Sequence, residues 1–184
     1  PTQVDKKTNR IHTEYMQAVA ATGRLSSNNP NLQNIPIKTA RGREVRKAFI
    51  AKDANHVIIS ADYSQIELRV LADMANELVL IEAFKNKEDI HTKTAQQIFD
   101  KEEITSLERR QAKAVNFGII YGQSSWGLSE EINISPKDAD RFIKKYYETF
   151  PGIKVFMDTV IENAMNTGYA ETLYNRRRYL PELK

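Results

Sequence analysis

The hydrophobic pattern separates a first part with short apolar runs from a second part with helical periodicity. Residues 24–47 carry mainly polar and turn-forming side chains, which predicts an extended or turning segment. Residues 47–51 and 57–61 are typical of short strands, and the β-branched run of the latter predicts a buried central strand. From about residue 64 to residue 167 the spacing is helical, and residues 169–180 predict a hairpin. Strands followed by helices predict an α+β fold.

Interruptions of the helical pattern predict several short helices. They fall at residues 86–89, 101–105, 124–125, 134–136 and 151–152. Ser64 with Glu67, and Thr105 with Glu108, have the Ser/Thr-x-x-Glu spacing of a helix capping box, so we expect helices to begin at both places. Gly122 is suited to end the helix that begins at Thr105.

Charge and cysteine content narrow the class of protein. The net charge of +3 is too small by itself to indicate a nucleic-acid partner, but residues 1–50 hold nine basic and three acidic side chains. The absence of cysteine excludes disulfide frameworks, thiolate metal sites and cysteine nucleophiles. No apolar run approaches the ~18–20 residues of a membrane span. We expect a cytoplasmic protein, and the start at Pro1 suggests a piece of a longer one.

Two cations and two aromatic residues share one face of the helix expected after Thr105. Arg109, Lys113, Phe117 and Tyr121 recur at every fourth position, and each step of four residues rotates the helix face by only about 40°. Such a face could hold a polyphosphate at one end and stack a base or sugar at the other. Spacing alone is more typical of an amphipathic helix with buried aromatics, although Gly118 and Gly122 beside them indicate a close approach.

A second cluster of polar residues follows the expected central strand. The Asp62 carboxylate and the backbone carbonyl of Tyr63 are hard oxygen ligands, suited to Mg²⁺, which takes one or two protein carboxylates together with substrate phosphates. The alternative is purely structural. Asp62 would then be an acid near a helix N-terminus, and Glu67 would be the capping partner of Ser64.

The motifs themselves resemble a known family. Residues 62–69, Asp-Tyr-Ser-Gln-Ile-Glu-Leu-Arg, resemble motif A of the family A DNA polymerases, and Arg-x-x-x-Lys-x-x-x-Phe-x-x-x-Tyr-Gly at residues 109–122 resembles their motif B. Residues 22–27 and 30–36 resemble the segment with which that family grips the primer–template. Asp-Ile-His at residues 89–91 resembles its triphosphate contact. The resemblance covers nearly the whole chain and is closest to the bacterial polymerase I branch.

The resemblance implies part of a polymerase palm, with a short antiparallel sheet and helices, plus a mainly helical fingers subdomain. Residues 1–85 would be the partial palm and residues 86–184 the fingers. The thumb, the exonuclease domain and motif C, a His-Asp-Glu sequence with the second catalytic aspartate, would be absent. None of the three histidines is followed by aspartate. We therefore expect the chain by itself to bind DNA and nucleotide weakly and to be inactive.

The resemblance also implies roles for individual residues. Asp62 and Lys113 would be catalytic, and Asp62 with the Tyr63 carbonyl would bind metal, with two Mg²⁺ ions in the complete active site. The residues expected to bind the deoxynucleoside triphosphate are Gln65, Glu67, His91, Arg109, Lys113, Phe117 and Tyr121. Those expected to bind primer–template DNA are Arg24, Asn31, Gln33, Asn34 and Tyr121. Glu67 would be the steric gate against a ribose 2′-hydroxyl.

The implied activity is template-directed DNA synthesis, by nucleotidyl transfer from a deoxynucleoside triphosphate to a primer 3′-hydroxyl. A single-subunit RNA polymerase would have no use for the Glu67 gate, so Glu67 and Phe117 favour DNA. A non-catalytic nucleic-acid-binding module would be expected to lose the metal ligand, whereas Asp62, Lys113 and Tyr121 are all present. For His91 the alternative is an ordinary surface histidine behind an N-cap aspartate.

Overall fold

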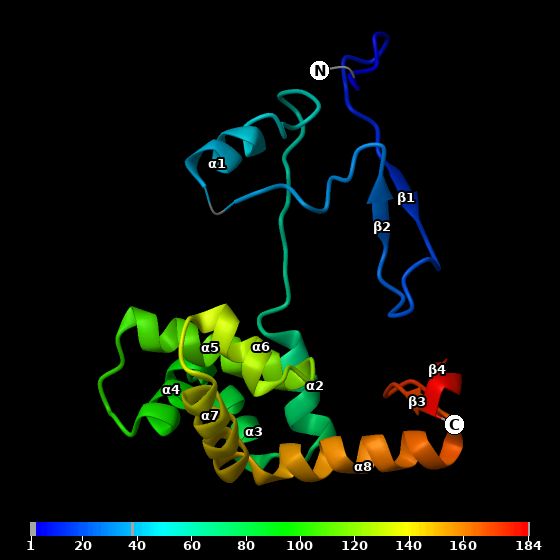
Figure 1. Ribbon diagram of the computed structural model, residues 1–184. Helices are drawn as coiled ribbons and strands as arrows, with labels where there is room; N and C mark the ends of the chain where they lie inside the picture. The colour runs from blue at the N-terminus through cyan, green and yellow to red at the C-terminus, as the bar shows by residue number, and fades with distance from the viewer. Residues whose placement is uncertain (1–2, 38, 184) are drawn as a thin grey trace. The chain divides into compact units, whose positions relative to one another are not determined.

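The computed structural model describes residues 3–37 and 39–183 (Figure 1). The chain divides into two compact units, Pro1–Asp62 and Tyr63–Lys184. Helices and two short antiparallel strand pairs make up the regular structure of the described residues, so the predicted α+β class is confirmed. In that part of the chain, no helix is both long enough and apolar enough to cross a membrane.

The first unit is built on a hairpin and one polar helix. Its elements are β1 (Glu14–Met16), β2 (Ser26–Asn28) and α1 (Ala40–Arg46). β1 and β2 pair antiparallel. The buried Ser27 holds the hairpin to the segment that follows, because its Oγ lies 2.6 Å from Thr13 Oγ1 and accepts a 3.0 Å hydrogen bond from Leu32 N–H. This contact fixes the loop that carries Asn31, Gln33 and Asn34.

Two expectations for this unit were wrong. Residues 47–51 and 57–61 form no strand, and Val57, Ile58 and Ile59 of the expected central strand are 81%, 61% and 85% exposed. A β-branched run becomes a strand only when another strand supplies hydrogen bonds and cross-strand contacts, and none does so within the described residues. Helix α1 was missed because it buries only Gly42 and has no apolar stripe; its start is set by the Thr39 cap.

The second unit is a helical cluster whose last helix carries a hairpin. Its helices are α2 (Ile66–Met74), α3 (Leu78–Lys85), α4 (Ile90–Phe99), α5 (Ser106–Ile120), α6 (Ser125–Ile132), α7 (Pro136–Thr149) and α8 (Pro151–Thr167). The core side chains include Leu68, Leu80, Ile90, Val115, Leu128, Tyr146, Phe150 and Ile153. Figure 1 shows α8 running out of the cluster to the C-terminal hairpin. All the predicted interruptions of the helical pattern are confirmed as helix boundaries.

The C-terminal hairpin is confirmed as well. Strands β3 (Tyr169–Glu171) and β4 (Arg177–Tyr179) pair antiparallel, and a short 3₁₀ helix, η1 (Pro181–Leu183), follows them. The rings of Tyr169 and Tyr179, which lie opposite each other, are 5.9 Å apart between centroids. Arg177 Nε donates a 2.7 Å hydrogen bond to Glu171, so one of the three consecutive arginines at residues 176–178 is held within the hairpin.

The two predicted capping boxes had different outcomes. Thr105 and Glu108 cap α5 reciprocally, which confirms that prediction, and hydrogen bonds from Lys101 and Thr105 lower the pKa of Glu108 to about 2. At Ser64 the predicted helix start is confirmed, because α2 begins at Ile66, but the predicted capping box was wrong. Helix α2 begins after Gln65, which is left-handed with φ of 53° and has no side-chain capping bond. Gln65, and not Ser64, is therefore the N-cap residue of α2.

A buried carboxylate that the sequence pattern did not single out joins two helix starts. Glu77, which is 4% exposed, accepts a 3.3 Å hydrogen bond from Val79 N–H at the start of α3 and a 2.8 Å hydrogen bond from Gly152 N–H at the start of α8. A Cβ at position 152 would lie 2.9 Å from Glu77 Oε2 and 3.0 Å from the backbone oxygen of Ala75, so a larger residue there would displace the carboxylate from this bridge. This bridge fixes α8 against the cluster that carries α5.

Candidate active site

Helix α5 has a core face and a separate polar and aromatic face. Its buried residues are Ala112, Val115, Asn116, Gly118 and Ile119. Arg109, Lys113 and Tyr121 are exposed, and Phe117 is half-buried. The two aromatic residues therefore lie outside the buried core, and the interpretation of this pattern as an amphipathic helix with core aromatics was wrong.

The exposed face of α5 is continuous with one ring from α4. The rings of Phe117 and Tyr121 are stacked, 6.5 Å apart between centroids and inclined by 15°. The Lys113 ammonium lies 5.9 Å from the centroid of the Phe117 ring, and the His91 ring lies 6.0 Å from it. A cation, an imidazole and two flat aromatic surfaces thus form one row. We call His91, Arg109, Lys113, Phe117 and Tyr121 the α5 row.

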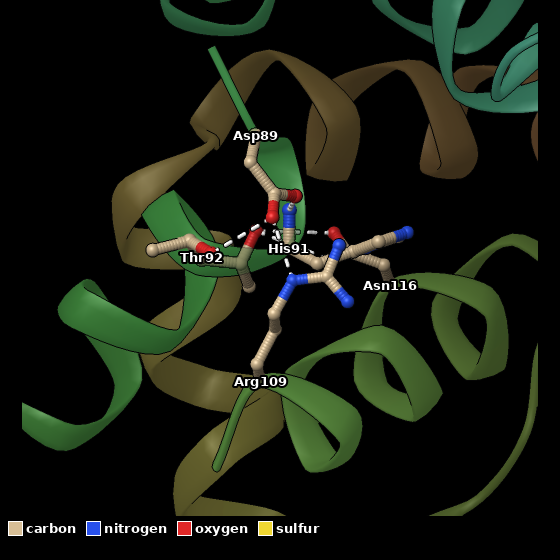
Figure 2. Close-up of polar contacts among 6 residues, drawn as sticks. Asp89, His91, Thr92, Arg109 and Asn116 are labelled. Carbon is tan, nitrogen blue, oxygen red and sulfur yellow. Dashed lines mark hydrogen bonds and ion pairs between the residues drawn. The ribbon is translucent and has the colours of Figure 1, made fainter. Parts of the chain in front are cut away.

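An ion pair between the start of α4 and the first turns of α5 sets one end of this row (Figure 2). Asp89 caps α4 by accepting a hydrogen bond of 3.1 Å from His91 N–H, and its other oxygen accepts from Thr92 Oγ1 at 2.9 Å and from Arg109 Nε at 2.6 Å. Partial burial opposes ionisation of Asp89, but the hydrogen bonds from Arg109 and Thr92 outweigh it and lower the pKa to about 2. The carboxylate is therefore charged at neutral pH, and the guanidinium is held in a fixed direction.

His91 is a buried residue, so its interpretation as an ordinary surface histidine was wrong. It is 3% exposed, and the side-chain amide of Asn116 donates a 3.2 Å hydrogen bond to its Nδ1. Burial lowers the pKa of His91, and the positive charges of Arg109 and Lys113 lower it further against the opposing effect of Asp89. The imidazole is therefore neutral near pH 7.

The end of α5 is joined to α2 through a carboxylate. Tyr121, the C-cap of α5, donates a 3.2 Å hydrogen bond from its hydroxyl to Glu67 Oε1. Glu67 stands in the first turn of α2 and does not form the expected capping box with Ser64. Ser64 instead accepts a 2.9 Å hydrogen bond at its backbone carbonyl from Arg69 Nε. Gln65, half-buried, lies at the same turn as Glu67.

Gly118 within α5 and Gly122 just after it have different roles. A Cβ at Gly118 would lie 2.5 Å from Gln123 Oε1, so the close approach expected there is made by the chain itself. Gly122 has a φ of +66°, and a Cβ there would meet nothing within 4 Å among the described residues, so the close approach expected at this glycine is not found. Gly122 follows the C-cap residue Tyr121, and its left-handed conformation ends α5 as expected. Glycine suits this position because residues with a Cβ adopt the left-handed conformation only at a cost in free energy.

The remaining expected residues lie in or beside the first unit. Arg24, Asn31, Gln33 and Asn34 are all exposed, and Asn31 Oδ1 accepts a 2.9 Å hydrogen bond from Gln33 N–H, closing a tight turn. This segment displays polar side chains on a fixed loop. Such groups can contact phosphate and sugar without reading sequence.

Asp62 and Tyr63 are the residues expected to hold metal. Both are exposed, and they stand where one compact unit ends and the next begins. Within residues 3–37 and 39–183, no three or more His, Cys, Asp or Glu side chains are grouped in a way that could hold a metal ion. A carboxylate and a backbone carbonyl nevertheless fit a hard cation such as Mg²⁺, because both offer oxygen ligands only.

The comparisons with known proteins agree with the motifs. The sequence profile of the family described as DNA polymerase family A matches residues 1–184. The chain belongs to DNA polymerase family A. It is 53% identical over 178 residues to the DNA polymerase I of Bacillus caldotenax, and 48% identical over 185 residues to that of Pseudomonas aeruginosa. These alignments cover 96% and 100% of the chain but 20% of each relative, so the chain spans about a fifth of their length.

A solved structure of a polymerase domain has a similar fold. The POL domain of Pol1 from M. smegmatis, in a complex with a DNA primer-template and dNTP, matches with a TM-score of 0.88 and 41% sequence identity. The match covers 100% of this chain and 32% of that chain. The predicted membership of the polymerase family is confirmed by both kinds of comparison.

Sequence reasoning missed three residues that shape the α5 row. The sequence indicates Asp89 as a helix cap within the Asp-Ile-His motif, whereas in the structure it also pairs with Arg109, twenty positions further on. Asn116 and Thr94 are buried and hydrogen-bonded to each other behind His91. A signal for Asn116 was available, because a polar residue on the apolar face of a helix requires a hydrogen-bonding partner.

Proposed function

We propose that this chain supplies the nucleotide-binding part of a template-directed DNA polymerase, which transfers a nucleotidyl group from a deoxynucleoside triphosphate to a primer 3′-hydroxyl. The observation that carries this proposal is the α5 row: two cations and two aromatic rings stand outside the core, beside a neutral buried histidine. Relatives at about half sequence identity are DNA polymerases I, and the similar solved structure contains primer-template and dNTP.

The polar end of the α5 row would bind the triphosphate. Lys113 and Arg109 bring fixed positive charge, and charge-assisted hydrogen bonds to phosphate are roughly twice as strong as neutral ones. Arg109 is aimed by Asp89 through its Nε, which leaves the two terminal nitrogens of the guanidinium for phosphate oxygens. His91 would add one neutral N–H donor.

The aromatic end of the row would receive the sugar and base. Phe117 presents a half-buried ring parallel to that of Tyr121, and stacking on such surfaces tolerates any of the four bases. Tyr121 would lie at the template base. Glu67, held by the Tyr121 hydroxyl, would occupy the space that a ribose 2′-hydroxyl needs, with Gln65 at the same turn contributing to substrate binding.

Family A polymerases use divalent metal ions, and we propose that the ions here are Mg²⁺. Asp62 and the backbone carbonyl of Tyr63 would hold them, since both are oxygen donors of the kind Mg²⁺ prefers. Two such ions, when bound, stabilise the attacking and leaving oxygens during phosphoryl transfer. The sequence contains no His-Asp-Glu, so a second catalytic aspartate of motif C is not among its residues.

The first unit would contribute to primer–template binding. Arg24, Asn31, Gln33 and Asn34 are exposed within the basic first fifty residues, and contacts of this kind position a duplex.

We assign residues 1–85 to a partial palm and residues 86–184 to the fingers. The bacterial origin of the relatives supports a cytoplasmic protein associated with the nucleoid.

Primer extension tests the proposal. A complete family A catalytic domain that carries this chain should extend a primer with Mg²⁺ and four deoxynucleotides, and Asp62→Ala should abolish extension while Asp158→Ala, at an exposed carboxylate of α8, should not. The 184-residue chain alone should give no extension above its own Asp62→Ala control. Full activity in the Asp62→Ala catalytic domain would contradict the proposed function.

A further inference from the structure

The core face of α5 contains one polar residue that the proposed function does not use. Asn116 is fully buried on α5, the helix that packs against α4. Burying an amide without hydrogen bonds costs free energy, so a buried asparagine is retained in a core only with partners. Its partners therefore indicate what it does.

Both partners of Asn116 lie on α4. Asn116 Oδ1 accepts from Thr94 Oγ1 at 3.3 Å, and Asn116 Nδ2 lies 3.2 Å from the same hydroxyl and donates to His91 Nδ1 at 3.2 Å. Figure 2 shows the Asn116 side chain directed from α5 toward the His91 ring. The Thr94 hydroxyl lies within hydrogen-bond distance of both amide atoms, and the amide nitrogen of Asn116 lies beside one particular ring nitrogen of His91, Nδ1.

That hydrogen bond determines where the imidazole carries its proton. An amide N–H can only donate, so Nδ1 must offer its lone pair, and in a neutral imidazole the proton is then on Nε2. The contact between the His91 and Phe117 rings limits rotation of the imidazole. Asn116 therefore selects both the tautomer and the direction of the Nε2–H donor.

We propose that Asn116 is a positioning residue that holds His91 as the Nε2–H tautomer, with its donor directed to the phosphates of the incoming nucleotide. This inference rests on the proposed function, because it deepens the role of His91 in the α5 row. Asn116 does not need to touch the nucleotide. Its effect on catalysis passes entirely through His91, and this distinguishes it from a residue that only fills the core.

A double-mutant cycle on a complete catalytic domain that carries this chain measures that dependence. The variants are Asn116→Leu, which has the same branched shape without polar atoms, His91→Ala, and both together. The probe is single-nucleotide incorporation on a primer–template, with kcat and KM for the deoxynucleotide determined separately. Each single substitution should raise KM about 10-fold and leave kcat within about 2-fold, as expected for one lost ground-state hydrogen bond to a charged group. The double variant should match His91→Ala to within about 2-fold.

Matched controls distinguish a positioning role of Asn116 from a general effect on core packing. Ser129→Ala removes a different buried hydrogen bond, from Ser129 Oγ to the Trp126 carbonyl on α6, and should leave KM unchanged. Asn116→Ala removes the amide without adding volume and replaces Asn116→Leu if thermal melting shows that the leucine variant is unfolded.

The outcomes distinguish a failure of the positioning inference for Asn116 from a failure of the proposed function. If His91→Ala raises KM but the Asn116 substitution does not, or if their effects multiply, the positioning inference is overturned while the proposed function stands. If His91→Ala leaves KM unchanged, the assigned contact between His91 and the triphosphate is wrong, and the inference falls with it. Non-additive effects on KM support the inference.

Discussion

The hydroxyl of Tyr121 donates a 3.2 Å hydrogen bond to the carboxylate of Glu67, across 54 positions of sequence. It joins the residue that ends α5 to the first turn of α2. The side chain proposed to exclude ribonucleotides is therefore held by a residue proposed to lie at the template base. A movement of the end of α5 would change the position of the gate.

Ribonucleotide discrimination should depend on Glu67. In a complete catalytic domain that carries this chain, Glu67→Ala should raise the ratio of ribonucleotide to deoxynucleotide incorporation by more than about tenfold, because the space for a 2′-hydroxyl is no longer filled. Competition between the two nucleotides on one primer–template measures this ratio. The matched control is Glu162→Ala, at an exposed carboxylate of α8. An unchanged ratio in Glu67→Ala would limit this residue to a structural role.

The capping box of α5 should contribute measurably to stability. Thr105 Oγ1 accepts a 3.2 Å hydrogen bond from Glu108 N–H, and removing a threonine N-cap typically costs about 1 kcal/mol. Thr105→Ala should therefore lower the free energy of unfolding by about 1 kcal/mol in a urea titration of the chain. Ser106→Ala, one position further on and exposed, serves as the control. Equal effects of the two substitutions would show that the capping box does not stabilise α5.

The two capping boxes show what the sequence could predict. The Thr-x-x-Glu spacing was sufficient to predict the capping box at Thr105, because the Thr105 side chain forms its hydrogen bonds within its own helix. The same spacing at Ser64 failed because Glu67 meets Tyr121 from another helix and Gln65 adopts a left-handed conformation. Local signals predicted the boundaries of the helices from residue 86 onward, whereas the strand expected at residues 57–61 depended on a partner strand that no local signal can supply.

The pairing of Asp89 with Arg109 should appear as a dependence of stability on pH. The pKa of Asp89 is depressed to about 2, so its contribution is fully present above the unfolded pKa of about 3.9 and is lost as the pH falls through about 2. The Asp89 side chain is 38% exposed, so screening by solvent keeps this contribution below about 1 kcal/mol. Melting temperatures between about pH 4 and pH 2 should fall less steeply for Asp89→Asn than for the unsubstituted chain.

Asparagine at position 89 can still cap α4, so this variant isolates the ion pair from the cap. Glu108 also has a pKa of about 2, and because it is unchanged in Asp89→Asn its titration contributes equally to both melting series. Parallel melting curves for the two proteins would contradict a stabilising role for the Asp89–Arg109 ion pair.

The candidate site was predictable as a set of motif residues but not as a network. The spacing of Arg109, Lys113, Phe117 and Tyr121 predicted that they share one helix face, and the resemblance to polymerases predicted that this face binds the nucleotide. Packing of α4 against α5 determines which partners those side chains meet. The contact of Asn116 with His91 therefore required the structure.

The central claim is that the exposed face of α5 binds the incoming nucleotide, and one comparison of two variants tests it most directly. In a complete catalytic domain that carries this chain, Lys113→Ala should lower kcat/KM for deoxynucleotides by at least about tenfold and leave primer–template affinity within about twofold, since a charge-assisted phosphate contact is lost. Arg24→Ala should mainly weaken the binding of primer–template DNA. Thermal melts exclude unfolding, which would reduce both activities together. Near-normal kcat/KM in Lys113→Ala would contradict the assignment of this face to the nucleotide.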